Sequence, residues 1–331
     1  MKKTAFICNN PATIDRVYAQ GRKEKVGEIS DLYPTVITEK NLEQHADALK
    51  EVEAAFSTWG MPKLTQEQLN ILPALKAVFY SAGSVKGFAE PLLDRDIIVM
   101  SAWGANGVPV AEYALAQILL SNKGFFRNVR ACVSREARRG AFRGRGNFGE
   151  TVAILGAGMI GRALIKLLSN FRLKVIVWDP FLSDEKAAEL GVEKVSSLSE
   201  AFQRGLVVSN HLANVPETRG LLTAELFSAM RKDATFINTG RGATVVEDDM
   251  ISVLRERQDL TALLDVTAPE PPVEGSPLYT LPNVHLTTHI AGSLGDEVVR
   301  MADYSIQEFQ AWEQGRPLRY AVTREMLSTM A

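Results

Sequence analysis

The 331-residue chain holds little cysteine, no long apolar run and no excess of charge of either sign. Its two cysteines, Cys8 and Cys132, cannot build a disulfide framework and favour a reducing compartment. The apolar run over residues 5–8 is too short for a signal peptide, and no run approaches the roughly 20 residues of a membrane span. These absences predict a cytoplasmic protein that does not enter a membrane.

Positive and negative side chains nearly balance, with 37 lysines and arginines against 39 aspartates and glutamates. The net charge of −2 gives no sign of nucleic acid or of an anionic membrane as a partner. A locally basic stretch at residues 127–145 is interpreted as a solvated helix face and loop. We also predict no metal site.

One stretch, residues 151–179, carries the most specific pattern. A strand-forming run ends in glycines spaced G-x-G-x-x-G, followed by a helical repeat over 159–168 and a second apolar run over 174–178. This is the context that a dinucleotide fingerprint requires. The glycines allow a tight turn, backbone approach to a pyrophosphate and close helix–strand packing, and the helix N-terminus attracts phosphates. We therefore predict a dinucleotide site that includes Gly156, Gly158, Met159, Ile160 and Gly161.

The acid at the end of the second run, Asp179, selects between the two nicotinamide dinucleotides. Its carboxylate can accept hydrogen bonds from both ribose hydroxyls of an adenosine, whereas it would repel a 2′-phosphate. Pro180 and Phe181 follow, and no basic residue occurs before Lys186. The sequence predicts NAD as the cofactor in preference to NADP.

Short apolar runs alternate with helical patterns along the chain, which predicts parallel sheets covered by helices on both faces. Pro109 suits the first position of a helix, and residues 110–121 form a strongly apolar helical repeat. Residues 294–314 form a long amphipathic helix with no strand partner of its own, so we expect it to return to the first domain. The expected strands are residues 4–8, 35–38, 54–58, 76–81, 97–101, 151–155, 174–178, 206–210, 234–238, 261–265 and 285–287.

Three polar residues follow strands of the second sheet and have the chemistry of a hydride-transfer site. His289 suits proton transfer, because the pKa of an unperturbed histidine, about 6.5, lies near working pH. Glu270 beside that histidine would favour the imidazolium and fix its tautomer. Arg241 can hold a carboxylate with two parallel hydrogen bonds. Each of the three also has a purely structural interpretation when it is considered alone.

The motifs GAGMIG, NTGRG, DVTAPEP and LTTHIAG, with the segment VMSAWGANGVPVAEYALAQIL, resemble those of the D-isomer-specific 2-hydroxyacid dehydrogenase family over nearly the whole chain. The resemblance implies α/β architecture with two doubly wound parallel sheets. A Rossmann NAD-binding domain would cover residues 105–295, and a discontinuous, flavodoxin-like substrate domain would cover residues 1–104 plus 296–331. It also implies a homodimer formed through residues 109–150.

The resemblance implies roles for particular residues as well. Arg241, Glu270 and His289 would be the catalytic set, and Asp265 would hold the nicotinamide carboxamide. The other implied contacts are Thr218, Thr239 and Gly292 for the cofactor, and Gly83, Ser84, Val85, Trp103 and Asn106 for the substrate.

The chain departs from the family pattern in three places. Thr288 stands where proline usually precedes the catalytic histidine, residues 213–215 differ from the usual loop, and Trp103 replaces a common proline. With Trp59, Trp103 is expected either to fill the pocket, leaving room for glyoxylate, pyruvate or hydroxypyruvate, or to wall a larger apolar slot. We favour the small substrate.

The predicted function is that of an NAD-dependent D-2-hydroxyacid dehydrogenase, such as a hydroxypyruvate reductase, acting on a small 2-oxo acid. Formate oxidation is disfavoured, because family members with that activity carry glutamine where Glu270 stands. The alternative is an NADH-sensing binding protein, like the co-repressors built on this scaffold, since those keep the same three residues.

Overall fold

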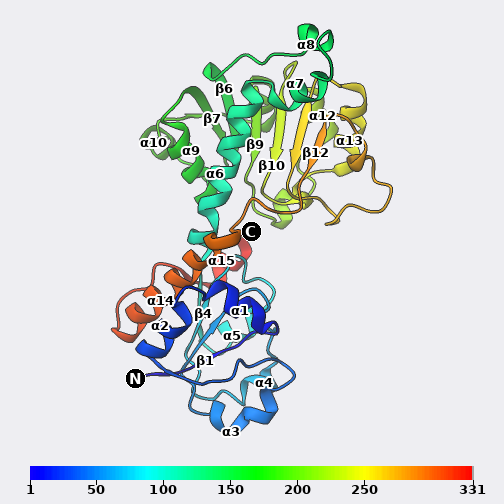
Figure 1. Ribbon diagram of the computed structural model, residues 1–331. Helices are drawn as coiled ribbons and strands as arrows, with labels where there is room; N and C mark the ends of the chain where they lie inside the picture. The colour runs from blue at the N-terminus through cyan, green and yellow to red at the C-terminus, as the bar shows by residue number, and fades with distance from the viewer. Residues whose placement is uncertain (330–331) are drawn as a thin grey trace. The chain divides into compact units, whose positions relative to one another are not determined.

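The computed structural model describes residues 1–329. The chain divides into two compact units: unit 1 comprises Met1–Gly107 together with the C-terminal segment from Ser293, and unit 2 comprises Val108–Gly292. Each unit is one sheet covered by helices (Figure 1). The sequence-based boundaries after residue 104 and before residue 296 each lie three residues from these divisions (107 − 104 and 296 − 293).

The sheet of unit 2 has seven parallel strands in the order β12-β11-β10-β9-β6-β7-β8. The chain starts at β6 in the middle, winds to one edge, and then returns to build the other edge from β9 onward. This reversal is the doubly wound Rossmann order. The strands are β6 (Phe148–Leu155), β7 (Arg172–Trp178), β8 (Glu193–Lys194), β9 (Val207–Asn210), β10 (Thr235–Asn238), β11 (Thr261–Leu264) and β12 (Val284–Leu286).

Alternate residues of β6 point to opposite faces of this sheet, and each face buries its own apolar cluster. Val152 and Ile154 pack with α6, α9 and α10, whereas Ala153 and Leu155 pack with α11, α12 and α13 (Figure 1). The helices are α6 (Trp103–Asn122), α7 (Phe125–Ala131), α8 (Ala137–Gly140), α9 (Met159–Leu168), α10 (Asp184–Glu189), α11 (Leu198–Arg204), α12 (Ala224–Ser228) and α13 (Glu247–Glu256), with 3-10 turns η2 (Pro216–Thr218), η3 (Gly242–Thr244) and η4 (Pro277–Tyr279).

The sheet of unit 1 has the order β13-β5-β4-β3-β1-β2, with β1 to β5 parallel and β13 antiparallel. The order 2-1-3-4-5 of its parallel strands is the flavodoxin-like winding. Its elements are β1 (Lys3–Phe6), α1 (Pro11–Val17), α2 (Arg22–Ile29), β2 (Asp31–Leu32), η1 (Leu42–His45), α3 (Ala46–Leu49), β3 (Ala54–Ser57), α4 (Gln66–Leu69), β4 (Ala77–Tyr80), α5 (Ala89–Leu93), β5 (Ile98–Ser101), η5 (Gly295–Val298), α14 (Val299–Glu313), β13 (Ala321–Val322) and α15 (Arg324–Thr329).

The long C-terminal helix α14 belongs to unit 1, although the whole of unit 2 precedes it in the chain. Phe309 is fully buried, and its ring lies 5.1 Å from that of Phe56 on β3 and 5.5 Å from that of Phe79 on β4. These aromatic contacts fix the helix on the sheet. The core of unit 1 therefore needs residues from both ends of the chain.

Two predicted elements were wrong. Residues 35–38 form no strand; a single bridge joins Ile37 to Ile7, and the edge strand is β2, because Pro34 interrupts the extended run that follows it. The apolar helix does not begin at Pro109 but at Trp103, so Trp103 and Asn106 lie in its first two turns and not in a loop. Pro109 therefore lies inside the helix, where its missing N–H leaves the Ala105 carbonyl without its intrahelical donor while the helix continues to Asn122.

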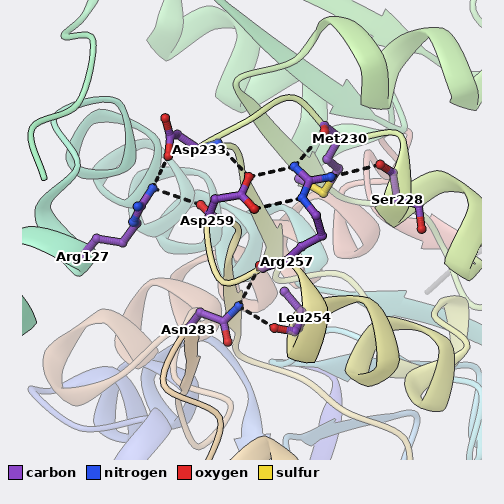
Figure 2. Close-up of polar contacts among 8 residues, drawn as sticks. All are labelled: Arg127, Ser228, Met230, Asp233, Leu254, Arg257, Asp259 and Asn283. Atoms are coloured by element: carbon purple, nitrogen blue, oxygen red, sulfur yellow. Dashed lines mark hydrogen bonds and ion pairs between the residues drawn. The ribbon is translucent and has the colours of Figure 1, made fainter.

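At the amino ends of β10 and β11, a polar network holds α7 to the base of the unit 2 sheet (Figure 2). Arg127 of α7 pairs with Asp233 and donates to the Asp259 carbonyl at 3.1 Å, while Arg257 binds both carboxylate oxygens of Asp259 at 2.9 and 2.7 Å.

Within residues 1–329, no helix combines the length and apolarity needed to cross a membrane.

Candidate active site

The glycine loop between β6 and α9 has the shape expected for a dinucleotide. A Cβ at Gly161 would lie 2.1 Å from the Gly156 carbonyl oxygen, so only glycine permits this contact between loop and helix. A Cβ at Gly158 would meet nothing within 4 Å. In the described residues, the N–H groups of Gly158, Met159 and Ile160 donate to no protein acceptor. Open space and free donors at a helix N-terminus fit a pyrophosphate.

Asp179 lies directly after β7, next to this loop. One carboxylate oxygen accepts a hydrogen bond from the Ala157 N–H at 2.6 Å, and the other accepts one from the Phe181 N–H at 2.7 Å. Each oxygen of an ionised carboxylate can accept a second bond. The half-buried side chain is thus held in place while it keeps acceptor capacity for ribose hydroxyls.

Asp265, directly after β11, is almost fully buried and accepts three hydrogen bonds. Its Oδ1 accepts from the Thr287 hydroxyl at 2.6 Å and from the Ile290 N–H at 2.8 Å. Its Oδ2 accepts from the Ala291 N–H at 2.9 Å. All three donors belong to the turn after β12 that carries His289, so one carboxylate fixes this turn.

His289 and Glu270 are paired. The Nδ1 atom of His289 lies 2.6 Å from Oε1 of Glu270, and both side chains are about half exposed. Because the pair uses Nδ1, the Nε2 atom is left to face a ligand. A carboxylate on one ring nitrogen fixes the tautomer and orientation of the ring, as proton transfer through the other nitrogen requires.

Arg241, directly before η3, is brought toward this pair by a close approach of two loops. A Cβ at Gly242 would lie 2.0 Å from the Thr267 carbonyl carbon, so glycine is required where the two loops touch. Burial lowers the pKa of Arg241, and the nearby Glu270 carboxylate acts in the opposite direction. The guanidinium donates to the Gly240 carbonyl at 2.7 Å. With five N–H donors, it keeps others for an anion.

The remaining predicted cofactor residues of unit 2 lie at the same carboxyl edge of the sheet. Thr239, buried after β10, has its hydroxyl 3.4 Å from Nδ1 of His211. The Thr218 hydroxyl is occupied within its own loop, where it donates to the Ala213 carbonyl at 2.5 Å. Gly292 closes the turn held by Asp265. The structure thus gives Thr218 a role in shaping residues 213–218.

In unit 1, the predicted substrate loop follows β4. The Thr58 hydroxyl donates to the Ser81 carbonyl at 2.8 Å, which joins this loop to the one after β3. Among the described residues, the N–H groups of Gly83, Ser84 and Val85 have no protein acceptor. Successive free N–H groups of this kind suit a carboxylate.

The two predicted aromatic residues of unit 1 are anchored in different ways. Trp103 packs edge-to-face on Tyr320, with ring centroids 5.6 Å apart. Trp59 is partly buried on the core, and the Arg16 guanidinium lies 5.6 Å from its ring centroid. The Asn106 side chain accepts a hydrogen bond from the Ser293 N–H at 3.0 Å. Trp103 is therefore packed against the C-terminal segment of its own unit.

Sequence reasoning missed a buried amide pair at the same edge. Asn210 and Asn238 end neighbouring strands in register, and the Asn210 amide donates to Asn238 at 3.0 Å and to Thr244 at 2.9 Å. Asn238 in turn accepts from the Gly240 N–H at 3.1 Å, which shapes the turn before Arg241. Two apolar strands that both end in asparagine were the available signal.

Comparisons with known proteins identify the family of this chain. The D-isomer specific 2-hydroxyacid dehydrogenase NAD-binding domain matches residues 115–291. D-3-phosphoglycerate dehydrogenase of Methanocaldococcus jannaschii is 28% identical over 286 residues, which are 86% of this chain and 53% of that protein. The chain spans about half the length of the curated relatives it matches first.

Solved structures share the fold. Apo D-mandelate dehydrogenase of Rhodotorula graminis superposes with a TM-score of 0.80 at 22% identity, covering 98% of both chains. A phosphoglycerate oxidoreductase from Rhizobium etli gives 0.79 at 24% identity, covering 98% of this chain and 99% of that one. The family match spans more than half of the chain, from within α6 to the turn after β12. The chain belongs to the D-isomer specific 2-hydroxyacid dehydrogenase family.

Proposed function

We propose that this protein is an NAD-dependent D-2-hydroxyacid dehydrogenase that reduces a small 2-oxo acid. The observation that carries the proposal is the 2.6 Å pair of His289 and Glu270, with Arg241 beside it, at the same sheet edge as the glycine loop. A nicotinamide bound there supplies or accepts a hydride. What the chain must add is a proton source and a clamp for the carboxylate.

Each residue of the set then has one task. His289 delivers a proton from Nε2 to the carbonyl oxygen in reduction and removes it in oxidation. Glu270 holds the ring through Nδ1 and favours the charged form of the imidazole. Arg241 binds the carboxylate and polarises the carbonyl. The free N–H groups of residues 83–85 supply further donors for the carboxylate.

The choice of NAD rests on Asp179. Its carboxylate is held by two backbone N–H groups next to the glycine loop, so it cannot readily swing away from a 2′-phosphate. The neighbouring Phe181 is exposed and uncharged. Asp265 offers its remaining acceptor position to the nicotinamide carboxamide, and Thr239, Thr218 and Gly292 line the same edge.

A small substrate fits the aromatic residues of unit 1 best. The Thr58–Ser81 hydrogen bond joins the loop that carries Trp59 to the loop of residues 83–85, and we propose that the indole lines the carboxylate site. We propose glyoxylate, pyruvate or hydroxypyruvate as substrate. Trp103, packed on Tyr320, would limit the space for the substrate indirectly, because it fixes the start of α6.

We also propose a homodimer formed through residues 109–150. This segment exposes five large apolar side chains, Leu120, Phe125, Val129, Val133 and Phe148. The Arg127 network in Figure 2 holds α7, which carries Phe125 and Val129 of this set. A Phe125→Glu, Val129→Asp double variant should elute as a monomer, whereas Val273→Glu, an exposed residue outside the segment, should not change the mass.

The test of the activity is NADH consumption with a panel of glyoxylate, pyruvate, hydroxypyruvate and phenylpyruvate, repeated with NADPH. We expect the highest kcat/KM with NADH and one of the three small acids. NADH binding without turnover of any acid would refute the enzyme proposal and favour the NADH-sensing alternative.

A further inference from the structure

The His289 side chain makes few polar contacts that could hold the turn that carries it. The His289 side chain is half exposed, and its one hydrogen bond in the described structure goes to Glu270, which is itself half exposed. Its backbone has a φ of 59°, the left-handed region that histidine occupies uncommonly. Something other than the histidine must therefore hold this backbone.

Asp265 provides that support from one side of the sheet edge. Its three hydrogen bonds reach the residue two before His289 and the two residues after it, Thr287, Ile290 and Ala291. The bond from the Thr287 hydroxyl, at 2.6 Å, is the shortest of the three. It is also the only one made by a side chain, so it can be removed by mutation without altering the backbone.

Thr287 is linked in turn to α6. The Tyr113 hydroxyl donates to the Thr287 hydroxyl at 3.3 Å, and the Thr287 N–H donates to the Leu264 carbonyl at 3.0 Å. A carboxylate can only accept, so the hydroxyl proton of Thr287 is committed to Asp265, and the Thr287 oxygen accepts from Tyr113. The two hydrogen bonds therefore run in one direction, from Tyr113 to Thr287 and from Thr287 to Asp265.

We propose that Thr287 is a positioning residue for His289, acting through the Asp265 carboxylate. The inference rests on the proposed function of His289 as the proton donor. The hydroxyl draws the carboxylate to the start of the turn, and the same carboxylate orients the Ile290 and Ala291 N–H groups at its end. Loss of the hydroxyl loosens the turn and moves the imidazole from its productive place. A displacement of about 1 Å is enough to cost roughly 100-fold in rate.

The test compares Thr287→Val, which keeps the shape and removes the hydroxyl, with Thr287→Ser, which keeps the hydroxyl. We expect Thr287→Val to lower kcat by about 10- to 100-fold, with KM for the oxo acid and Kd for NADH within about threefold of wild type. Thr287→Ser should restore kcat to within about threefold. Thr280→Val, at an exposed threonine of the same unit, is the matched control and should have full activity.

A second measurement does not depend on turnover. Hydrogen exchange of the segment 286–292, measured without cofactor, should be at least about tenfold faster in Thr287→Val and unchanged in Thr287→Ser. Unchanged exchange would overturn the inference even if the wild type reduced no oxo acid, so the two proposals fail separately. With an active wild type, a Thr287→Val kcat within twofold, or a Thr287→Ser as slow as Thr287→Val, would also overturn it. If Thr287→Val does not fold, Tyr113→Phe should lower kcat by about threefold at unchanged KM, and full activity would contradict the proposal.

Discussion

The carboxyl edges of the two sheets offer a ligand different chemical groups. In unit 2, the loops after β10, β11 and β12 present ionisable side chains, such as Asp265, which accepts from the turn after β12, and the pair of His289 and Glu270. In unit 1, the loop after β4 presents backbone N–H groups, and the Thr58–Ser81 hydrogen bond joins it to the loop after β3. Side chains can donate and accept protons, whereas peptide groups can only bind. The edge of unit 2 therefore suits proton transfer, and the edge of unit 1 suits the binding of an anion.

The largest effect should come from the proton donor in unit 2. His289→Ala should lower kcat by about 10²- to 10⁴-fold while NADH still binds, because only the proton transfer is lost. Steady-state kinetics and fluorescence titration with NADH measure the two quantities. His45→Ala is the control in unit 1, where the ring bonds to the Tyr33 hydroxyl. Equal losses in both variants would remove the distinction between the units.

Glycine substitutions at the two sheet edges should have the next largest effects, and they should differ in their effect on NADH binding. Gly161→Ala places a Cβ 2.1 Å from a backbone oxygen, so it should lower the melting temperature and weaken NADH binding about 100-fold or more. Gly158→Ala meets no protein atom, so it should weaken NADH binding at an unchanged melting temperature. Gly83→Ala, whose Cβ would meet only the Asn106 amide at 3.6 Å, should fold normally and bind NADH as the wild type does. Normal NADH binding by Gly158→Ala would mean that the cofactor does not approach this loop.

Cofactor selection should respond to Asp179. Asp179→Ala removes the charge that opposes a 2′-phosphate, and it also frees the Ala157 N–H. We expect the ratio of kcat/KM with NADH to that with NADPH to fall by about tenfold or more. A wild-type enzyme that uses both cofactors equally would contradict the assignment of NAD.

The smallest effect concerns acid stability. Burial lowers the pKa of His211, in unit 2, to about 4. The unfolded chain binds a proton to this ring below about pH 6.5, whereas the folded one does not, so stability is lost as the pH falls from about 6.5 to 4. His211→Gln should reduce this loss by on the order of 1 kcal/mol between pH 7 and pH 5. Urea denaturation at both pH values measures the free energy of unfolding. If the variant and the wild type lost the same stability between pH 7 and pH 5, His211 would accept a proton in the folded protein.

The sequence by itself determined the parts of this protein that depend on local pattern. The glycine spacing, the helix over residues 159–168 and the acid after β7 could be read directly, because each follows from the chemistry of a few neighbouring residues. The parallel sheets covered by helices on both faces followed from the alternation of strands and helices. The start of α6 could not be read, because proline favours the first position of a helix, whereas Pro109 lies inside this one.

Only the tertiary structure decided how the candidate site is supported. Asp265 and Thr287 lie 22 residues apart, and nothing near either one predicts their hydrogen bond. Their contact arises because β11 and β12 are parallel neighbours whose ends fall in register. The approach of Gly242 to Thr267 likewise depends on the pairing of β10 with β11. Residue types name the chemistry, but strand order and register decide which of them meet.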